Sequence, residues 1–194
     1  TTISVGFITK ILSGFGKEAV AAFGVASRLE MFALMVIMSL GSVLIIFVGQ
    51  NLSKQKVQRI SEALKISLKF SVIWGAVIYV LLLFLGQAII SLFTKDSMVI
   101  EIATKYFYII GASYGFQGLV MLSTASFNGI NKPYPSALFS IIRMLVLYVP
   151  LAWLGARIFN INGVFWAGFI ANVIVGTLSF TYLLKTVRNI KVDH

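Results

Sequence analysis

Four charged side chains lie inside long apolar stretches of this 194-residue sequence: Lys10, Arg28, Glu30 and Arg143. A charge in mid-bilayer costs at least about 2.5–3.5 kcal/mol on insertion scales, so each needs a partner or a wet cavity. Glu30 is the only carboxylate in the set, and a carboxylate can take up or release a proton or a cation. Proton or cation exchange is one chemistry that this carboxylate offers.

Glu30 has two open interpretations. It stands about 17 Å along a helix that begins near Ala19, at 1.5 Å per residue, which is close to mid-membrane. It serves a cation or proton pathway, or it is a structural partner for a donor on another helix. Arg28 points to nearly the opposite side of that helix, so the two do not bridge along one face. Anchoring suits Arg28 better than proton exchange, because an arginine keeps its charge, and cavity lining is its other candidate role.

Other polar side chains in the apolar stretches are candidates for lining a substrate cavity: Tyr114, Gln117, Arg143 and Asn172. Hydrogen bonds between helices explain Gln117 and Asn172 at least as well as ligand binding does. Arg143 lies too deep in its predicted span to reach the membrane surface, and we expect it at an inner vestibule. Lys10 is close enough to a turn to extend its charge to the surface.

Enzyme motifs are absent from the sequence. It has no Gly-x-Ser-x-Gly, no paired histidines, and no Walker or Rossmann loop. Having no cysteine, it offers no thiolate nucleophile, disulfide or cysteine-based metal site. Its only histidine, His194, is the last residue and is interpreted as part of a tail. We therefore predict no enzyme, no catalytic residue, no metal site and no cofactor.

Composition places these residues in a membrane protein. Hydrophobic residues make up 59% and charged residues 11%, against about 25% charged residues in soluble domains. The apolar residues come in runs of about twenty, the length that crosses a bilayer as a helix. The net charge of +10 would raise nucleic acid as a partner. The cations lie between apolar runs, however, so we predict membrane lipid and no nucleic acid as partners.

The apolar runs predict an all-α integral membrane protein with six transmembrane helices, at 1–14, 19–48, 70–92, 106–127, 134–158 and 164–184. The first is short for a span, and the chain is interpreted as cut out of a longer protein with that helix already under way. A basic amphipathic stretch, 51–69, predicts a helix on the membrane surface, and 98–105 an amphipathic lead-in. Pro150 is expected to bend the fifth helix, and 160–163 to form a tight loop.

The distribution of Lys and Arg predicts orientation. One side of the predicted bundle holds nine: Lys54, Lys56, Arg59, Lys65, Lys69, Lys132, Lys185, Arg188 and Lys191. The other holds four: Lys17, Lys95, Lys105 and Arg157. The side richer in cations, with the C-terminus, is predicted to be cytoplasmic, in a multi-pass protein of the cell membrane.

Four segments in order resemble one transporter family. Residues 19–30, AVAAFGVASRLE, followed by VGQN at 48–51, resemble the eighth helix of the multidrug and toxic compound extrusion (MATE) family. FNGINKP at 127–133 and NGVFWA at 162–167 are similar to later parts of that pattern. The match covers nearly the whole chain.

The resemblance implies a twelve-helix antiporter of two six-helix lobes. Such a protein exports cationic or amphipathic drug-like compounds in exchange for Na+ or H+. Residues 1–194 would be a single lobe, helices seven to twelve, whose partner is the missing N-terminal six-helix half. Glu30 matches the family's acidic position in the eighth helix. Gln117 stands where some members carry a carboxylate in the tenth, and the seventh-helix acidic position falls at or before Thr1.

Three alternatives remain open at this stage. A lipid-linked oligosaccharide flippase of the same superfamily would want a more cationic cavity than Arg28 and Arg143 offer. A non-transporting membrane scaffold subunit would leave the buried Glu30 unexplained. A membrane-embedded enzyme would need a catalytic cluster, which the sequence lacks.

The nine-to-four distribution of cations yields a topology prediction. Cysteines introduced singly at Ser53 and Thr94 of this cysteine-free chain should react from opposite sides of the membrane. An impermeant thiol reagent added outside intact cells should label Thr94→Cys and spare Ser53→Cys. The reverse labelling pattern would mean that the orientation is inverted.

Overall fold

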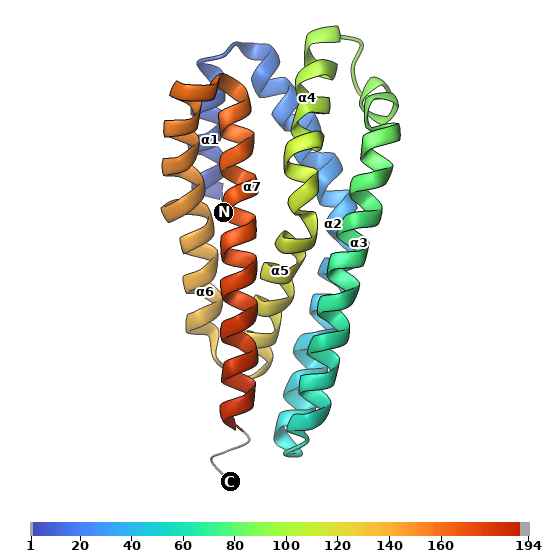
Figure 1. Cartoon of the computed structure of the whole chain (residues 1–194), viewed down its shortest axis with the longest axis vertical. Coiled ribbons are helices and arrows are strands. Elements are labelled where there is room, and N and C mark those ends of the chain that lie inside the picture. Colours follow the sequence, from blue (N-terminus) through green and yellow to red (C-terminus); the bar gives the residue numbers. More distant parts are fainter. Residues whose placement is uncertain (1, 191–194) are drawn as a thin grey trace.

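The computed structural model describes the backbone of residues 2–190 and the side chains of residues 4–190, and these residues form helices joined by short turns (Figure 1). Three residues named in the sequence analysis lie outside the described residues: Thr1, Lys191 and His194. The elements run in the order α1 (Thr2–Ser13), α2 (Lys17–Ser53), α3 (Val57–Ser91), α4 (Ser97–Ile110), η1 (Gly111–Ser113), α5 (Tyr114–Gly129), α6 (Pro133–Ile141), η2 (Ile142–Tyr148) and α7 (Val149–Ile190). The predicted all-α fold is confirmed.

The helices pass along the bundle six times. Three runs are long and apolar enough to cross a membrane: Lys17–Ser53, Val57–Ser91 and Pro133–Ile190. The last run contains two passes, because α7 reverses at one end of the bundle and returns beside α6 (Figure 1). α4, η1 and α5 together form another pass, and α1 is the short first one.

The prediction of a separate surface helix over 51–69 is wrong. Residues 51–53 end α2, Gln55 makes a turn with a φ of 56°, and α3 runs unbroken from Val57 to Ser91. No glycine or proline separates the basic stretch from the apolar one, so a single helix continues through both. Its apolar face packs on the bundle, where Ile60 and Leu64 are buried in one core cluster with Val187.

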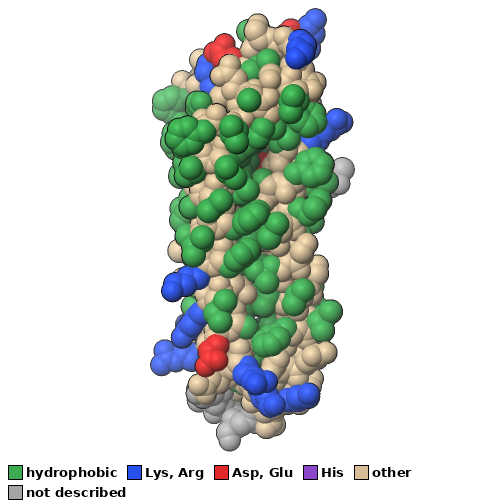
Figure 2. Space-filling view, turned by 90° about the vertical axis from the view of Figure 1, so that its right-hand side faces the viewer, with side chains coloured by type: hydrophobic (Ala, Val, Ile, Leu, Met, Phe, Trp, Pro, Cys, Tyr) green, Lys and Arg blue, Asp and Glu red, His purple; other side chains and the backbone are tan. Residues whose placement is uncertain are grey.

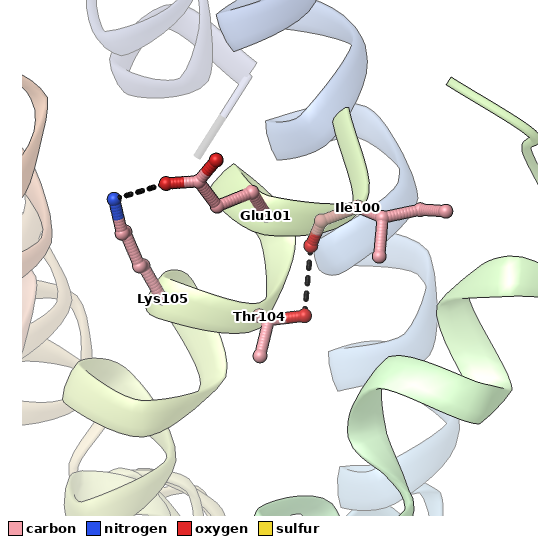
Figure 3. A network of polar contacts seen from close by, with 4 residues as sticks. All are labelled: Ile100, Glu101, Thr104 and Lys105. Carbon is pink, nitrogen blue, oxygen red and sulfur yellow. Dashed lines mark hydrogen bonds and ion pairs between the residues drawn. The ribbon is translucent and has the colours of Figure 1, made fainter. Parts of the chain in front are cut away.

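The predicted lead-in over 98–105 forms the start of α4. The carboxylate of Asp96 caps this helix, accepting hydrogen bonds from the backbone N–H groups of Met98 and Val99 at 2.9 and 3.3 Å. On the exposed face Lys105 pairs with Glu101 at 2.6 Å (Figure 3). One residue before Lys105, Thr104 donates to the carbonyl of Ile100 at 2.7 Å.

Two departures from α geometry were not predicted. The fourth span, expected as one helix over 106–127, is interrupted by the 3₁₀ turn η1 at Gly111–Ser113. The π-helical segment η2, at Ile142–Tyr148, lies directly before the proline expected to bend the fifth helix. Pro150 has no backbone N–H, so the carbonyl four residues earlier loses its usual donor and the local hydrogen-bond register can widen.

The loop expected over 160–163 is shorter than predicted. The chain reverses at Phe159 (φ −120°, ψ 17°) and Asn160 (φ 54°, ψ −143°), and Asn tolerates positive φ better than most residues. Gly163 already lies in the returning pass, against Gly155 of the outgoing one. Neither glycine leaves room for a Cβ: an added Cβ on Gly155 would lie 2.5 Å from the carbonyl oxygen of Gly163.

The surface has the layout of a membrane protein. Hydrophobic side chains cover the middle of one face, and Lys and Arg side chains gather toward its two ends (Figure 2). Large apolar side chains are exposed along α3, including Phe84 at 82% of its full accessibility. Exposed apolar surface on this scale indicates contact with lipid or with another membrane segment.

The contact between the two passes of α7 predicts that Gly163→Ala destabilises the protein. The new Cβ would overlap the backbone of Gly155, and overpacking of this kind costs about 1–3 kcal/mol. The melting temperature in detergent should fall. Gly24→Ala is the matched control, since an added Cβ there meets nothing within 4 Å. Equal melting temperatures for the two variants would show that this contact is loose.

Candidate functional site

Glu30 lies on α2 and is held by side chains from two other helices. Its carboxylate accepts a hydrogen bond from the hydroxyl of Tyr106, on α4. The other oxygen accepts one from Nε2 of Gln117, on α5, at 2.7 Å. The sequence left open whether Glu30 has a structural partner on another helix, and the structure supplies two such donors.

Hydrogen bonds continue from Gln117 across the bundle to an arginine. Oε1 of Gln117 accepts from Nδ2 of Asn172 at 3.3 Å, and Oδ1 of Asn172 accepts from Nη1 of Arg143 at 3.0 Å. Each amide thus donates toward the carboxylate and accepts from the side of the guanidinium. The series Glu30, Gln117, Asn172 and Arg143, which we call the polar relay, joins opposite charges without a direct ion pair between them.

The interruptions in the helices position this relay. η1 supplies Ser113, whose hydroxyl accepts a second hydrogen bond from Nδ2 of Asn172 at 2.9 Å. η2 carries Arg143, so the guanidinium comes from the π-helical segment. Gly168 lets α7 approach closely, because an added Cβ would lie 3.1 Å from Ile110 and 3.3 Å from Tyr148.

The relay lines a cavity of about 180 Å³ between the helices. Glu30, Gln117, Arg143 and Asn172 all contribute to its wall, which also carries the side chains of Ser27, Tyr106 and Tyr148. Drug-sized ligands usually occupy pockets of about 300–1,000 Å³. This cavity suits water and a small ion, whereas a drug molecule would need a larger space.

One relay group has unused hydrogen-bonding capacity. Nε of Arg143 is buried and has no hydrogen-bond partner among the described residues, and the same holds for the hydroxyl of Tyr114. A buried donor left unpaired costs about 1–3 kcal/mol. Arg143 can therefore take a further acceptor.

Two predicted cavity residues lie away from the cavity wall. Arg28 is exposed on α2, and Tyr114 is fully buried in the core at 1% exposure, and neither lines this cavity. Lys10 is exposed, as expected for a lysine near a helix end, and lines a groove with Arg157. The residues that the structure describes contain no group of three or more His, Cys, Asp or Glu side chains placed to hold a metal ion.

Sequence reasoning missed Tyr106, Ser113 and Tyr148. Tyr106 carried a usable signal, because a tyrosine at the start of an apolar span needs a partner for its hydroxyl. Ser113 and Tyr148 carried none, since the role of each depends on which helix lies opposite.

The relay predicts that Asn172→Ala destabilises the protein. The substitution removes the acceptor of Arg143 and the donor to Gln117, and unpaired buried groups cost about 1–3 kcal/mol. The melting temperature in detergent should fall. Thr177→Ala is the control on the same helix, because that exposed hydroxyl bonds only to the carbonyl of Val173. A similar melting temperature for both variants would mean that the relay does not stabilise the bundle.

Comparisons with known proteins agree on one family. The profile of the MatE family matches residues 2–154. The chain is 34% identical over 180 residues to the FAD transporter of Shewanella oneidensis, an alignment that covers 93% of this chain and 40% of that protein. It is 24% identical over 190 residues to the multidrug export protein MepA of Staphylococcus aureus strain N315, covering 95% of this chain and 42% of MepA.

Solved structures agree as well. The bent form of the Vibrio cholerae MATE transporter VcmN superposes with a TM-score of 0.91 at 28% identity, covering 97% of this chain and 44% of that one. The chain thus spans less than half the length of the relatives it matches. With a family profile matched over most of its length and this shared fold, the chain belongs to the MatE family.

Proposed function

We propose that residues 1–194 form one six-helix lobe of an ion-coupled exporter of cationic or amphipathic compounds, and that the lobe works with a second lobe in the cell membrane. The single observation that carries the proposal is the placement of Glu30, which lines a small polar cavity at the end of a relay crossing the bundle. Family membership and the multidrug export proteins among its relatives support the same function. Alternating access would rock the two lobes around a shared central site.

Uptake of a proton by Glu30 would rearrange the relay. The ionised carboxylate accepts from two donors, the hydroxyl of Tyr106 and the amide of Gln117. A protonated carboxyl group must itself donate one hydrogen bond. The Tyr106 hydroxyl can turn to accept it, or the Gln117 amide can flip, which would break its alignment with Asn172. Protonation thereby alters contacts among α2, α4, α5 and α7, which is the differential interaction that coupling requires.

The side chains favour a proton over Na+ as the coupling ion at this cavity. A sodium ion would need several oxygen ligands, and Glu30 is the one carboxylate among the described residues of the cavity wall. The amide oxygens of Gln117 and Asn172 already accept hydrogen bonds within the relay. A proton needs only the carboxylate, and no further cofactor is required.

A second candidate substrate class is a phosphate-bearing dinucleotide. The relative at 34% identity is an FAD transporter. Arg143, which has a spare buried donor, offers a positive charge that an anionic substrate would use. The cavity itself is too small for such a molecule, so binding would take place in the larger space between two lobes.

We predict that Glu30→Gln leaves the protein folded and reduces proton-driven export at least tenfold. Glutamine keeps the shape and an acceptor for Gln117, but it has no proton to exchange. Efflux should be measured in proteoliposomes holding the full-length protein under an imposed pH gradient, in parallel for a cationic dye and for FAD. Glu101→Gln is the control, because this glutamate pairs with Lys105 on an exposed face away from the cavity (Figure 3).

The outcomes separate the competing roles of Glu30. Reduced efflux with an unchanged melting temperature supports a coupling role. A lower melting temperature with proportionate loss of efflux assigns Glu30 a structural role. Normal efflux with normal stability would refute both the coupling role and the structural role. Separately, export of the cationic dye or of FAD identifies the substrate class that the protein carries.

A further inference from the structure

A second concave site lies at the end of the bundle where α2 leads into α3, and it shares no described lining residue with the cavity of the polar relay. It is a groove of about 710 Å³ between the first turns of α3 and the last turns of α7. Those two segments lie at the same end of the bundle (Figure 1). We call it the basic groove, because three cations line it: Lys65 from α3, and Lys185 and Arg188 from α7.

The basic groove has an apolar floor below its charged rim. Val187 is buried, and Val57 and Leu184 are half-buried. Val57 and Val187 belong to the core cluster that holds this end of the bundle together. The three cations are exposed, so their charges meet the surrounding medium above the apolar floor. The groove is therefore amphipathic, with cations from two helices above aliphatic side chains.

The charge balance of the groove favours an anion. Among the described residues that line the groove, Glu62 is the one carboxylate, and it accepts a hydrogen bond from Gln58 at 3.3 Å. Within residues 4–190, the ion pair that the structure contains is Lys105 with Glu101, at the other end of the bundle. None of the three groove cations is thus neutralised by a described carboxylate. Counted over these described residues, three cations against one carboxylate leave two positive charges in excess.

The position of the groove favours a lipid headgroup as the anion. On α3 the exposed surface changes from charged to apolar beyond Lys69, about one turn past Lys65, where Phe70 and Ile73 are exposed. Lys and Arg side chains gather at this lower end, beneath the hydrophobic band (Figure 2). The groove thus lies at the boundary where phosphates of a bilayer are found. Basic pockets between membrane helices suit anionic headgroups.

We propose that the basic groove binds the headgroup phosphate of an anionic phospholipid, with its acyl chains along the apolar surface of α3. The phosphate bridges α3 and α7 through Lys65, Lys185 and Arg188. A zwitterionic lipid binds more weakly, because its own ammonium group meets the same excess of positive charge. The site is separate from Glu30 and from the transported compound, so it stands whether or not the proposed export function holds.

Native mass spectrometry of the full-length protein in detergent tests the proposal, with phosphatidylglycerol and phosphatidylcholine as probes. Wild type should prefer phosphatidylglycerol. The double variant Lys185→Gln/Arg188→Gln should raise the Kd for phosphatidylglycerol about 30-fold, at the usual contribution of each cation near a membrane surface. Lys17→Gln/Lys95→Gln removes the same charge from the opposite end and should change that Kd less than twofold. Equal effects of the two double variants would overturn the proposal.

Glu62→Gln provides a test that misfolding cannot imitate. Removing the one carboxylate among the described lining residues should tighten phosphatidylglycerol binding about fivefold, since one repulsive charge is lost. Unchanged or weaker binding by this variant contradicts the proposal. So does equal affinity of wild type for the two lipids. Displacement of the lipid by soluble glycerol phosphate at a comparable concentration would show instead that the groove is a site for free phosphate.

Discussion

The structure depends on one constraint, which is that a charge among membrane helices must be compensated by polar groups brought from other helices. Glu30 on α2 and Arg143 in η2 carry opposite charges and do not form an ion pair with each other. Gln117 and Asn172 connect them, each donating on one side and accepting on the other. The result is a continuous, directional series of hydrogen bonds that ends at the carboxylate of Glu30.

Close backbone contacts make this compensation geometrically feasible. In lipid, burying apolar side chains against other helices gains little, so association depends on packing and on polar contacts. Gly168 brings α7 against Ile110 and Tyr148, next to the cavity, and Gly163 brings the two passes of α7 together. The 3₁₀ and π-helical segments then turn Ser113 and Arg143 toward Asn172. Departures from regular helix geometry are concentrated where polar chemistry is needed, a pattern often seen at functional sites.

The polar relay and the basic groove lie in different surroundings. The relay lies between helices, with its two amides buried and its two charged ends half-buried. The lower dielectric there strengthens each hydrogen bond and raises the cost of an unpaired polar group. The groove lies at one end, where its cations are exposed and meet the medium. In the relay, each charged group has a hydrogen-bond partner. In the groove, the described cations outnumber the carboxylates. That difference suits the relay to internal switching and the groove to attraction of an external anion.

The amino-acid order by itself determined the helical fold and the approximate spans, and it named the relay residues among its candidates for a polar site, because apolar runs and isolated polar groups within them are local features. It also determined the family, through segments such as 19–30. It did not determine that Glu30 would meet Tyr106, that Arg28 would face away from the cavity, or that 51–69 would join α3. Those outcomes depend on which helices are neighbours in the bundle, and packing between segments distant in the chain determines the neighbours. The tertiary structure alone placed a carboxylate, two amides and a guanidinium in one series, since hydrogen bonds require proximity that sequence spacing does not encode.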